Sequence, residues 1–163
     1  MPARQGFSLI EAMIASTILA ATVTAVSLPF TAGAQNEQDS ARTTLAVALA
    51  EGLMEEILSK PFDDPAGNQT PGPEAAETSR SLYDNIDDYH NYSDPAGQIK
   101  DANGVVFTDP LATGVSRSAT VEYVYLSGQS ATQAATIVRV TVTVKYKTQV
   151  VSTLQRLVYK YST

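Results

Sequence analysis

Residues 12–36, AMIASTILAATVTAVSLPFTAGAQN, form the stretch that decides the fold, because none of these 25 positions carries a charge. As an α-helix the stretch would be roughly 37 Å long at about 1.5 Å per residue. That length crosses a bilayer hydrocarbon core of about 30 Å with some tilt. A buried core helix is the alternative, but the stretch lies near the N-terminus behind a short leader that carries Arg4. We therefore predict a transmembrane helix over residues 7–33.

The composition excludes several classes of functional site. The chain has 163 residues, which favours one domain, and it contains no Cys and a single His. Disulfide scaffolds, thiol nucleophiles and zinc–thiolate sites are therefore excluded, and one His cannot build a multi-His metal centre. Seventeen acidic residues outnumber eleven basic ones. A net charge of −6 argues against nucleic acid as a partner.

The carboxylate of Glu11 separates this N-terminus from an ordinary secretory signal peptide. A signal peptide is cut after its apolar run at a small-residue site, and Ala32-Gly33-Ala34 is the best candidate for such a site here. That interpretation leaves Glu11 unexplained. A carboxylate at the start of an apolar run is costly unless it is paired or protonated.

The segment Gly6-Phe7-Ser8-Leu9-Ile10-Glu11 resembles the processing site of type IV prepilins and of type II secretion pseudopilins. The resemblance implies that residues 1–6 are a leader peptide and that prepilin peptidase cuts after Gly6. It further implies that Phe7 becomes the N-methylated first residue of the mature chain and that Glu11 becomes the fifth.

Removal of the leader would give Glu11 a partner for its charge. Phe7 would then carry a free ammonium about one helical turn from Glu11. In a filament, Glu11 of one subunit could pair with the Phe7 ammonium of its neighbour, which would neutralise two groups that are expensive in a low dielectric. The alternative is a Glu11 that pairs with its own N-terminus and has no role in assembly.

A second, amphipathic part of the helix is predicted over residues 37–59, within a long helix that occupies residues 7–60. An apolar stripe with a four-residue repeat runs along this part, at Leu45, Leu49, Leu53 and Ile57. Lys60-Pro61 is expected to end the helix, because Pro disfavours helix at the residue before it. Residues 61–114 are dense in Pro, Gly, Asn and Asp, which predicts an acidic irregular region.

The hydrophobic period changes to two in residues 115–163. Over residues 136–146 one face is nearly all Val and the other is polar. Residues 119–126 and 150–161 are similarly rich in Val, Tyr and Leu, so we predict about three antiparallel strands whose Val face packs on the helix stripe. The predicted fold class is α+β, with a long N-terminal helix on a C-terminal antiparallel sheet. The resemblance implies the pilin-like form of that architecture.

Within that family, three features favour a minor subunit. Major pilins often carry a C-terminal disulfide loop, and this chain has no Cys. Residues 48–58 resemble a helix segment of V-type minor pilins and I-type minor pseudopilins. Residues 62–64 and 83–89 resemble segments of minor pilins of the mannose-sensitive haemagglutinin pilus.

Calcium is the one candidate cofactor that the acidic region indicates. Asp101-Ala102-Asn103-Gly104 resembles the first half of a calcium-binding loop, but the EF-hand pattern stops there because no Glu follows at the required distance. The alternative is that Asp and Asn in this region form turns and solubilise the chain. The candidate ligands are Asp84, Asp87, Asp88, Asp101 and Asn103.

The sequence thus favours a structural protein over an enzyme. The expected partners are prepilin peptidase, other pilin or pseudopilin subunits and the inner membrane, with the C-terminal domain in the periplasm before assembly. A membrane-tethered periplasmic binding protein that never enters a filament is the main alternative, and a secreted domain cut near Ala34 is another.

Overall fold

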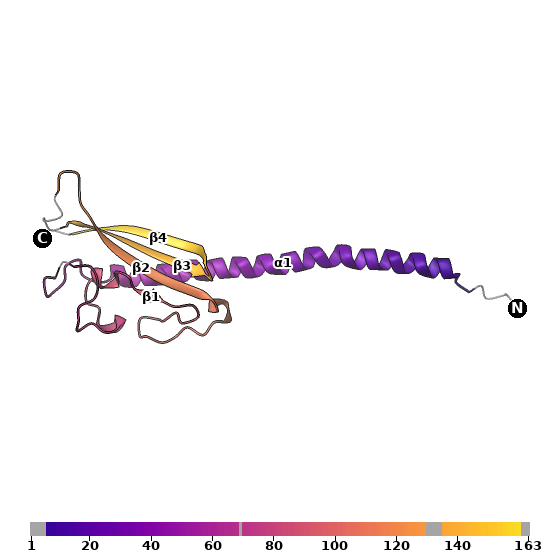
Figure 1. Ribbon diagram of the computed structural model, residues 1–163, viewed down its shortest axis with the longest axis horizontal. Coiled ribbons are helices and arrows are strands. Elements are labelled where there is room, and N and C mark those ends of the chain that lie inside the picture. The colour runs from indigo at the N-terminus through magenta and orange to yellow at the C-terminus, as the bar shows by residue number, and fades with distance from the viewer. Residues whose placement is uncertain (1–5, 69, 130–134, 161–163) are drawn as a thin grey trace. The chain divides into compact units, whose positions relative to one another are not determined.

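The computed structural model describes residues 6–68, 70–129 and 135–160. A 50-residue helix, α1 (Leu9–Leu58), precedes a four-stranded antiparallel sheet (Figure 1). The strands are β1 (Ser93–Asp94), β2 (Val115–Val124), β3 (Ile137–Tyr146) and β4 (Gln149–Tyr159), paired in that order. Three short 3-10 helices lie at Arg80–Leu82, Asp87–Tyr89 and Pro110–Ala112. The predicted α+β class, a long N-terminal helix with an antiparallel sheet, is confirmed.

The chain divides into two compact units, residues 1–40 and residues 41–163, and α1 supplies residues to both. In the first unit, the described residues are helical from Leu9 onward, and all of them are exposed. The described part of the chain contains one helix that is long and apolar enough to cross a membrane, and its most apolar window has no buried residue.

The core of the second unit forms where the predicted helix stripe meets the predicted Val face. Leu53 and Ile57 of α1 are fully buried, together with smaller residues on the same side of the helix. In β3, Val140 and Val142 are fully buried, while Thr141 between them is partly exposed, as a period of two requires. These residues belong to one hydrophobic cluster. Packing of the Val face on the helix stripe, within this unit, is therefore confirmed.

The sheet has one strand more than the three predicted. The extra strand, β1, is only two residues long and pairs with β2, Ser93 opposite Ser118 and Asp94 opposite Arg117. Two residues are too short for any hydrophobic period to show, which is why the sequence did not reveal this strand. The other strands pair as antiparallel neighbours, with a bulge in the β3–β4 register between Val144 and Lys145.

Candidate processing and assembly site

The peptide bond that follows Gly6 lies in an open segment before α1. Gly6 and Phe7 are both exposed, and the Phe7 side chain is 92% exposed. A Cβ added at Gly6 would meet no atom within 4 Å. The packing of the described residues therefore does not require glycine at this position, and a requirement for glycine would have to come from an enzyme that binds this segment.

Glu11 lies in the first turn of α1 and forms a capping box with Ser8. The Ser8 backbone N–H and hydroxyl both donate to Glu11 Oε2, each at 2.8 Å, and the Glu11 N–H donates to Ser8 Oγ at 3.3 Å. A capping box of this kind satisfies N–H groups that the first helical turn leaves without intrahelical acceptors. The Ser-x-x-Glu spacing was visible in the sequence, but we interpreted Glu11 only through its charge.

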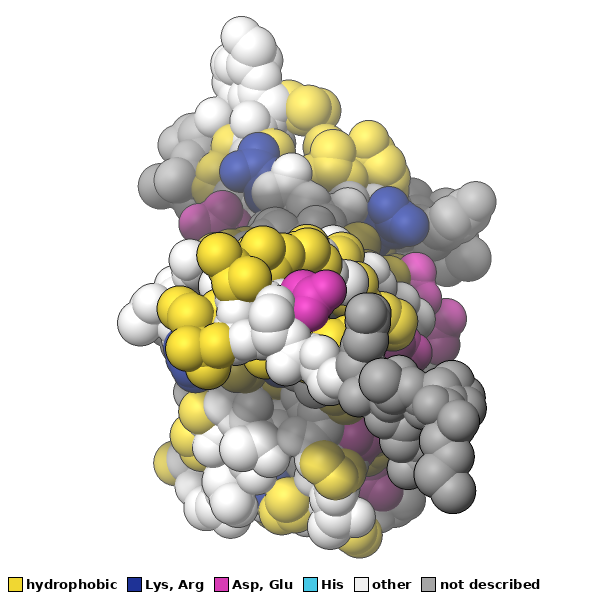
Figure 2. Space-filling model, turned by 90° about the vertical axis from the view of Figure 1, so that its right-hand side faces the viewer, with side chains coloured by type: hydrophobic (Ala, Val, Ile, Leu, Met, Phe, Trp, Pro, Cys, Tyr) yellow, Lys and Arg dark blue, Asp and Glu magenta, His cyan; other side chains and the backbone are white. Residues whose placement is uncertain are grey.

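Apolar side chains surround this site. Among the described residues, the large hydrophobic side chains from Phe7 to Phe30 are between 51% and 92% exposed. Figure 2 looks onto the N-terminal end of α1 and shows apolar side chains gathered around an acidic one. An apolar surface without intramolecular contacts needs a partner that excludes water, such as lipid or neighbouring copies of the same helix.

The hydroxyl groups in this part of α1 do not prevent it from entering lipid. Each donates to a backbone carbonyl three or four residues earlier in the helix. The donors are Ser16, Thr17, Thr22, Thr24, Ser27 and Thr31. A hydroxyl that is already hydrogen-bonded within its helix costs less to transfer from water to hydrocarbon than a free one.

In the structure, the candidate calcium ligands of the acidic region do not come together at one site. Asp101 Oδ1 accepts hydrogen bonds from the N–H groups of Asn103 and Val105, so this carboxylate is a turn former. Asp87 is buried and accepts from the Tyr123 hydroxyl. Asp84 is exposed, and its N–H donates to Asp88 Oδ2.

Only one of those candidates joins a carboxylate cluster among the described residues. In this cluster, one carboxylate oxygen from each of Glu74, Glu77 and Asp88 lies within 4.8 Å of the others. The sequence analysis missed Glu74 and Glu77, although their three-residue separation places two carboxylates close together in any tight turn. Burial raises the pKa of Glu77 to about 7, and the contact with the Glu74 side chain and the charge of Asp88 raise it further, whereas the Glu74 N–H acts in the opposite direction.

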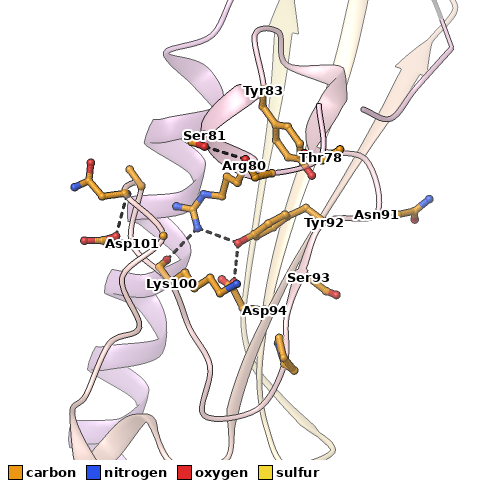
Figure 3. Close-up of a pocket in the computed structure, with 15 residues that line it drawn as sticks. Thr78, Arg80, Ser81, Tyr83, Asn91, Tyr92, Ser93, Asp94, Lys100 and Asp101 are labelled. Atoms are coloured by element: carbon orange, nitrogen blue, oxygen red, sulfur yellow. Dashed lines mark hydrogen bonds between the residues drawn. The ribbon is translucent and has the colours of Figure 1, made fainter. Parts of the chain in front are cut away.

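A cavity of about 400 Å³ lies beside this region, and Figure 3 shows its lining. Arg80 donates to both oxygens of Glu56 on α1, to the Tyr92 hydroxyl and to the Lys100 carbonyl. The Tyr92 hydroxyl in turn donates to Asp94 at 2.6 Å. These polar groups hydrogen-bond to one another. The contacts of Arg80 with Glu56 therefore hold the acidic region against α1.

The guanidinium of Arg117 also connects the acidic region to α1. Arg117 of β2 contacts Asp94 of β1 at 2.6 Å, and both side chains are almost fully buried. Arg117 also donates to the carbonyls of Leu49 and Lys100 at 3.0 and 2.7 Å. One buried side chain therefore ties α1 and the segment near Lys100 to strands β1 and β2 of the sheet.

Comparison with known proteins gives one match, and it lies at the N-terminus. Residues 1–27 match the family model described as the prokaryotic N-terminal methylation motif. No curated protein and no solved structure matches the chain. The matched residues include Gly6, Phe7 and Glu11, so the resemblance of this N-terminus to type IV prepilins is confirmed.

Proposed function

We propose that this chain is the precursor of a minor pilin or minor pseudopilin, a structural subunit without catalytic activity. Prepilin peptidase would cut after Gly6 and methylate Phe7. The processed chain would stay in the inner membrane with its sheet unit in the periplasm until it enters a type IV pilus or a type II secretion pseudopilus. The observation that carries the proposal is a methylation motif at the head of a helix whose large apolar side chains, from Phe7 to Phe30, are exposed.

The capping box suggests how Glu11 serves both the precursor and the filament. Both donors of Ser8 reach the same carboxylate oxygen, Oε2, and Ser8 remains in the chain after cleavage at Gly6. The other oxygen, Oε1, is therefore available to the Phe7 ammonium of a neighbouring subunit. An ion pair between buried groups is stabilising only when the remaining hydrogen-bonding positions of both groups are satisfied. The N–H and hydroxyl of Ser8 satisfy those of Glu11.

Burial of the exposed apolar side chains away from water would keep this part of α1 in lipid or in the filament centre. Complete burial of a Leu, Ile, Val or Phe side chain contributes about 1.5–3 kcal/mol relative to water. In the membrane these side chains already contact lipid, so tight packing between helices and pairing of Glu11 decide whether the filament is preferred. The second unit keeps its own core and would face outward.

The N-terminus of the native mature protein tests the proposal directly. Mass spectrometry of protein isolated from the producing cells should find a chain that begins at N-methylated Phe7. A chain that still begins at Met1 would overturn the proposal and indicate a membrane-tethered protein. A chain that begins near Gln35 would also overturn it and indicate a secreted domain released by signal peptidase.

The substitution Glu11→Ala tests assembly separately from processing. We expect the variant to be processed and its second unit to fold, but its incorporation into filaments to fall strongly. Glu37→Ala is the matched control, since Glu37 is an exposed acid on the same helix. Sheared surface filaments, quantified by immunoblot against total protein, give the measurement. Equal incorporation of both variants would remove Glu11 from the mechanism.

A further inference from the structure

The carboxylate cluster of Glu74, Glu77 and Asp88 brings three acidic groups together in the second unit. One oxygen of each group lies within 4.8 Å of the others, and Asp88 is fully buried. The nearby cations of the acidic region are directed elsewhere, because Lys60 donates to the Tyr83 carbonyl and Arg80 pairs with Glu56. In the part of the chain that the structure describes, no ion pair joins these three carboxylates to a Lys or Arg side chain.

The two carboxylate oxygens of Asp88 differ in their hydrogen bonds. Its Oδ2 accepts from the N–H groups of Asp84 and Asn85, at 2.9 and 3.0 Å. Its Oδ1 is buried and has no hydrogen-bond partner in the part of the chain that the structure describes. The same carboxylate interacts directly with Glu77. A buried carboxylate oxygen without a donor is expensive, unless a cation or a proton neutralises it.

Glu74 and Glu77 each accept a hydrogen bond from a neighbouring residue of the loop. Oε1 of Glu74 accepts from the Asn68 side-chain amide at 2.6 Å, and Oε2 of Glu77 accepts from the Glu74 N–H at 3.0 Å. These hydrogen bonds orient the two glutamates, and their carboxylates also contact one another, a contact between acidic groups that a cation would neutralise. Asp64 fixes the start of this loop, because its carboxylate accepts from the N–H groups of Ala66 and Asn68.

We propose that Glu74, Glu77 and Asp88 bind one calcium ion. Calcium takes six to eight oxygen ligands in flexible geometry and accepts carboxylates that bind through one or two oxygens. Each of the three carboxylates offers one oxygen to such a site, and water could supply the remaining ligands. Magnesium is less suitable, because it requires near-octahedral geometry and loses its water reluctantly.

The bound ion would link two segments that are separated in sequence. Glu74 and Glu77 lie in the loop that follows α1, whereas Asp88 lies in the 3-10 helix Asp87–Tyr89, whose Tyr89 packs in the core. Calcium would therefore fasten the loop to the core of the second unit and stabilise that unit. The site does not depend on processing at the N-terminus, so its failure would leave the proposed function intact.

Thermal unfolding of the full chain in detergent tests the site. After treatment with EGTA, addition of ~1 mM CaCl2, a concentration suited to an extracellular site, should raise the Tm of the second unit by about 5 °C. The same concentration of MgCl2 should raise it much less. Isothermal titration calorimetry should give one calcium ion per chain.

Two variants make the result specific. Glu77→Gln keeps the size of the side chain and should abolish the calcium-dependent rise in Tm. Glu51→Gln changes an exposed acid outside the cluster and should keep the full rise. An equal rise in both variants would overturn the proposal, since calcium would then act elsewhere. A wild-type chain that calcium does not stabilise, together with a Glu77→Gln variant that is more stable without metal, would also overturn it and indicate that the carboxylates share a proton.

Discussion

The two parts of α1 are built from similar residues but differ completely in burial. In the first unit Leu19 is 65% exposed and Phe30 is 75% exposed. In the second unit Leu53 and Ile57 are fully buried in a core shared with the sheet. Both parts are continuous helix, so helical structure by itself does not decide which side chains find partners within the chain.

Among the described residues, the second unit contains a partner for its own apolar helix stripe, and the first unit contains none for its apolar side chains. The second unit buries its helix stripe against Val residues of its own strands. The first unit presents apolar side chains on all sides and includes no strand among its described residues. A helix that is apolar all round is buried in a large core or in a membrane. In our proposal its partner comes from outside the chain, first as lipid and then as neighbouring subunits.

The largest expected effect concerns processing of the first unit. Gly6→Val should leave nearly all chains with the leader attached, because a branched side chain would obstruct the peptidase and the Gly6 segment itself has room for a Cβ. Gly33→Val is the matched control, since a Cβ there also meets no atom within 4 Å and the residue lies far from the cleavage point. Intact-mass measurement of both variants shows which of them retains the leader. Normal cleavage of Gly6→Val would contradict the proposed recognition.

The second prediction concerns the buried ion pair of the second unit. Arg117→Met should reduce the free energy of unfolding by about 3–5 kcal/mol, because it leaves the carboxylate of Asp94 buried without its partner. Arg139→Met is the control, since Arg139 lies 3.5 Å from Glu122 in an exposed pair and should change stability by about 0–1 kcal/mol. Denaturant unfolding followed by circular dichroism measures both. Similar losses would show that burial of the pair is unimportant.

The elements with a strong hydrophobic period were predictable from sequence. The four-residue repeat that includes Leu53 and the alternation of Val along β3 both identify the faces that meet in the core. The uncharged run identified the membrane-competent helix, because its signal depends on composition alone and needs no tertiary contact.

The polar contacts were not predictable in the same way. Asp94 and Arg117 are 23 positions apart, and the two-residue strand that pairs them has no pattern of its own. The carboxylates of Glu74 and Glu77 approach Asp88 only because irregular turns bring them together. Such contacts depend on tertiary structure. The capping box of Ser8 and Glu11 is local, and its Ser-x-x-Glu spacing can be recognised in the sequence.

The third prediction compares the two parts of α1 directly. Leu53→Ala should lower the free energy of unfolding of the second unit by about 2–5 kcal/mol, since it removes a fully buried side chain from the core. Leu19→Ala makes the same chemical change in the first unit and should alter that value by less than about 0.5 kcal/mol. Denaturant unfolding in detergent gives both numbers. A loss of similar size for Leu19→Ala would show that the units are not independent.

The smallest expected effect is a change in pH dependence at the junction of helix and acidic region. Burial alone would raise the pKa of Glu56, but hydrogen bonds from Arg80 and Tyr89 and the nearby positive charges outweigh burial and lower it below 4.5. The stability that Glu56 contributes is therefore present above pH 4.5 and lost as the pH falls through the lowered value. Glu56→Gln should cost about 1.5–3 kcal/mol at pH 7 and flatten the acid limb of the stability curve. Glu51→Gln, an exposed acid on the same helix, should keep the wild-type slope; an unchanged slope in Glu56→Gln would show that this carboxylate does not link the acidic region to α1.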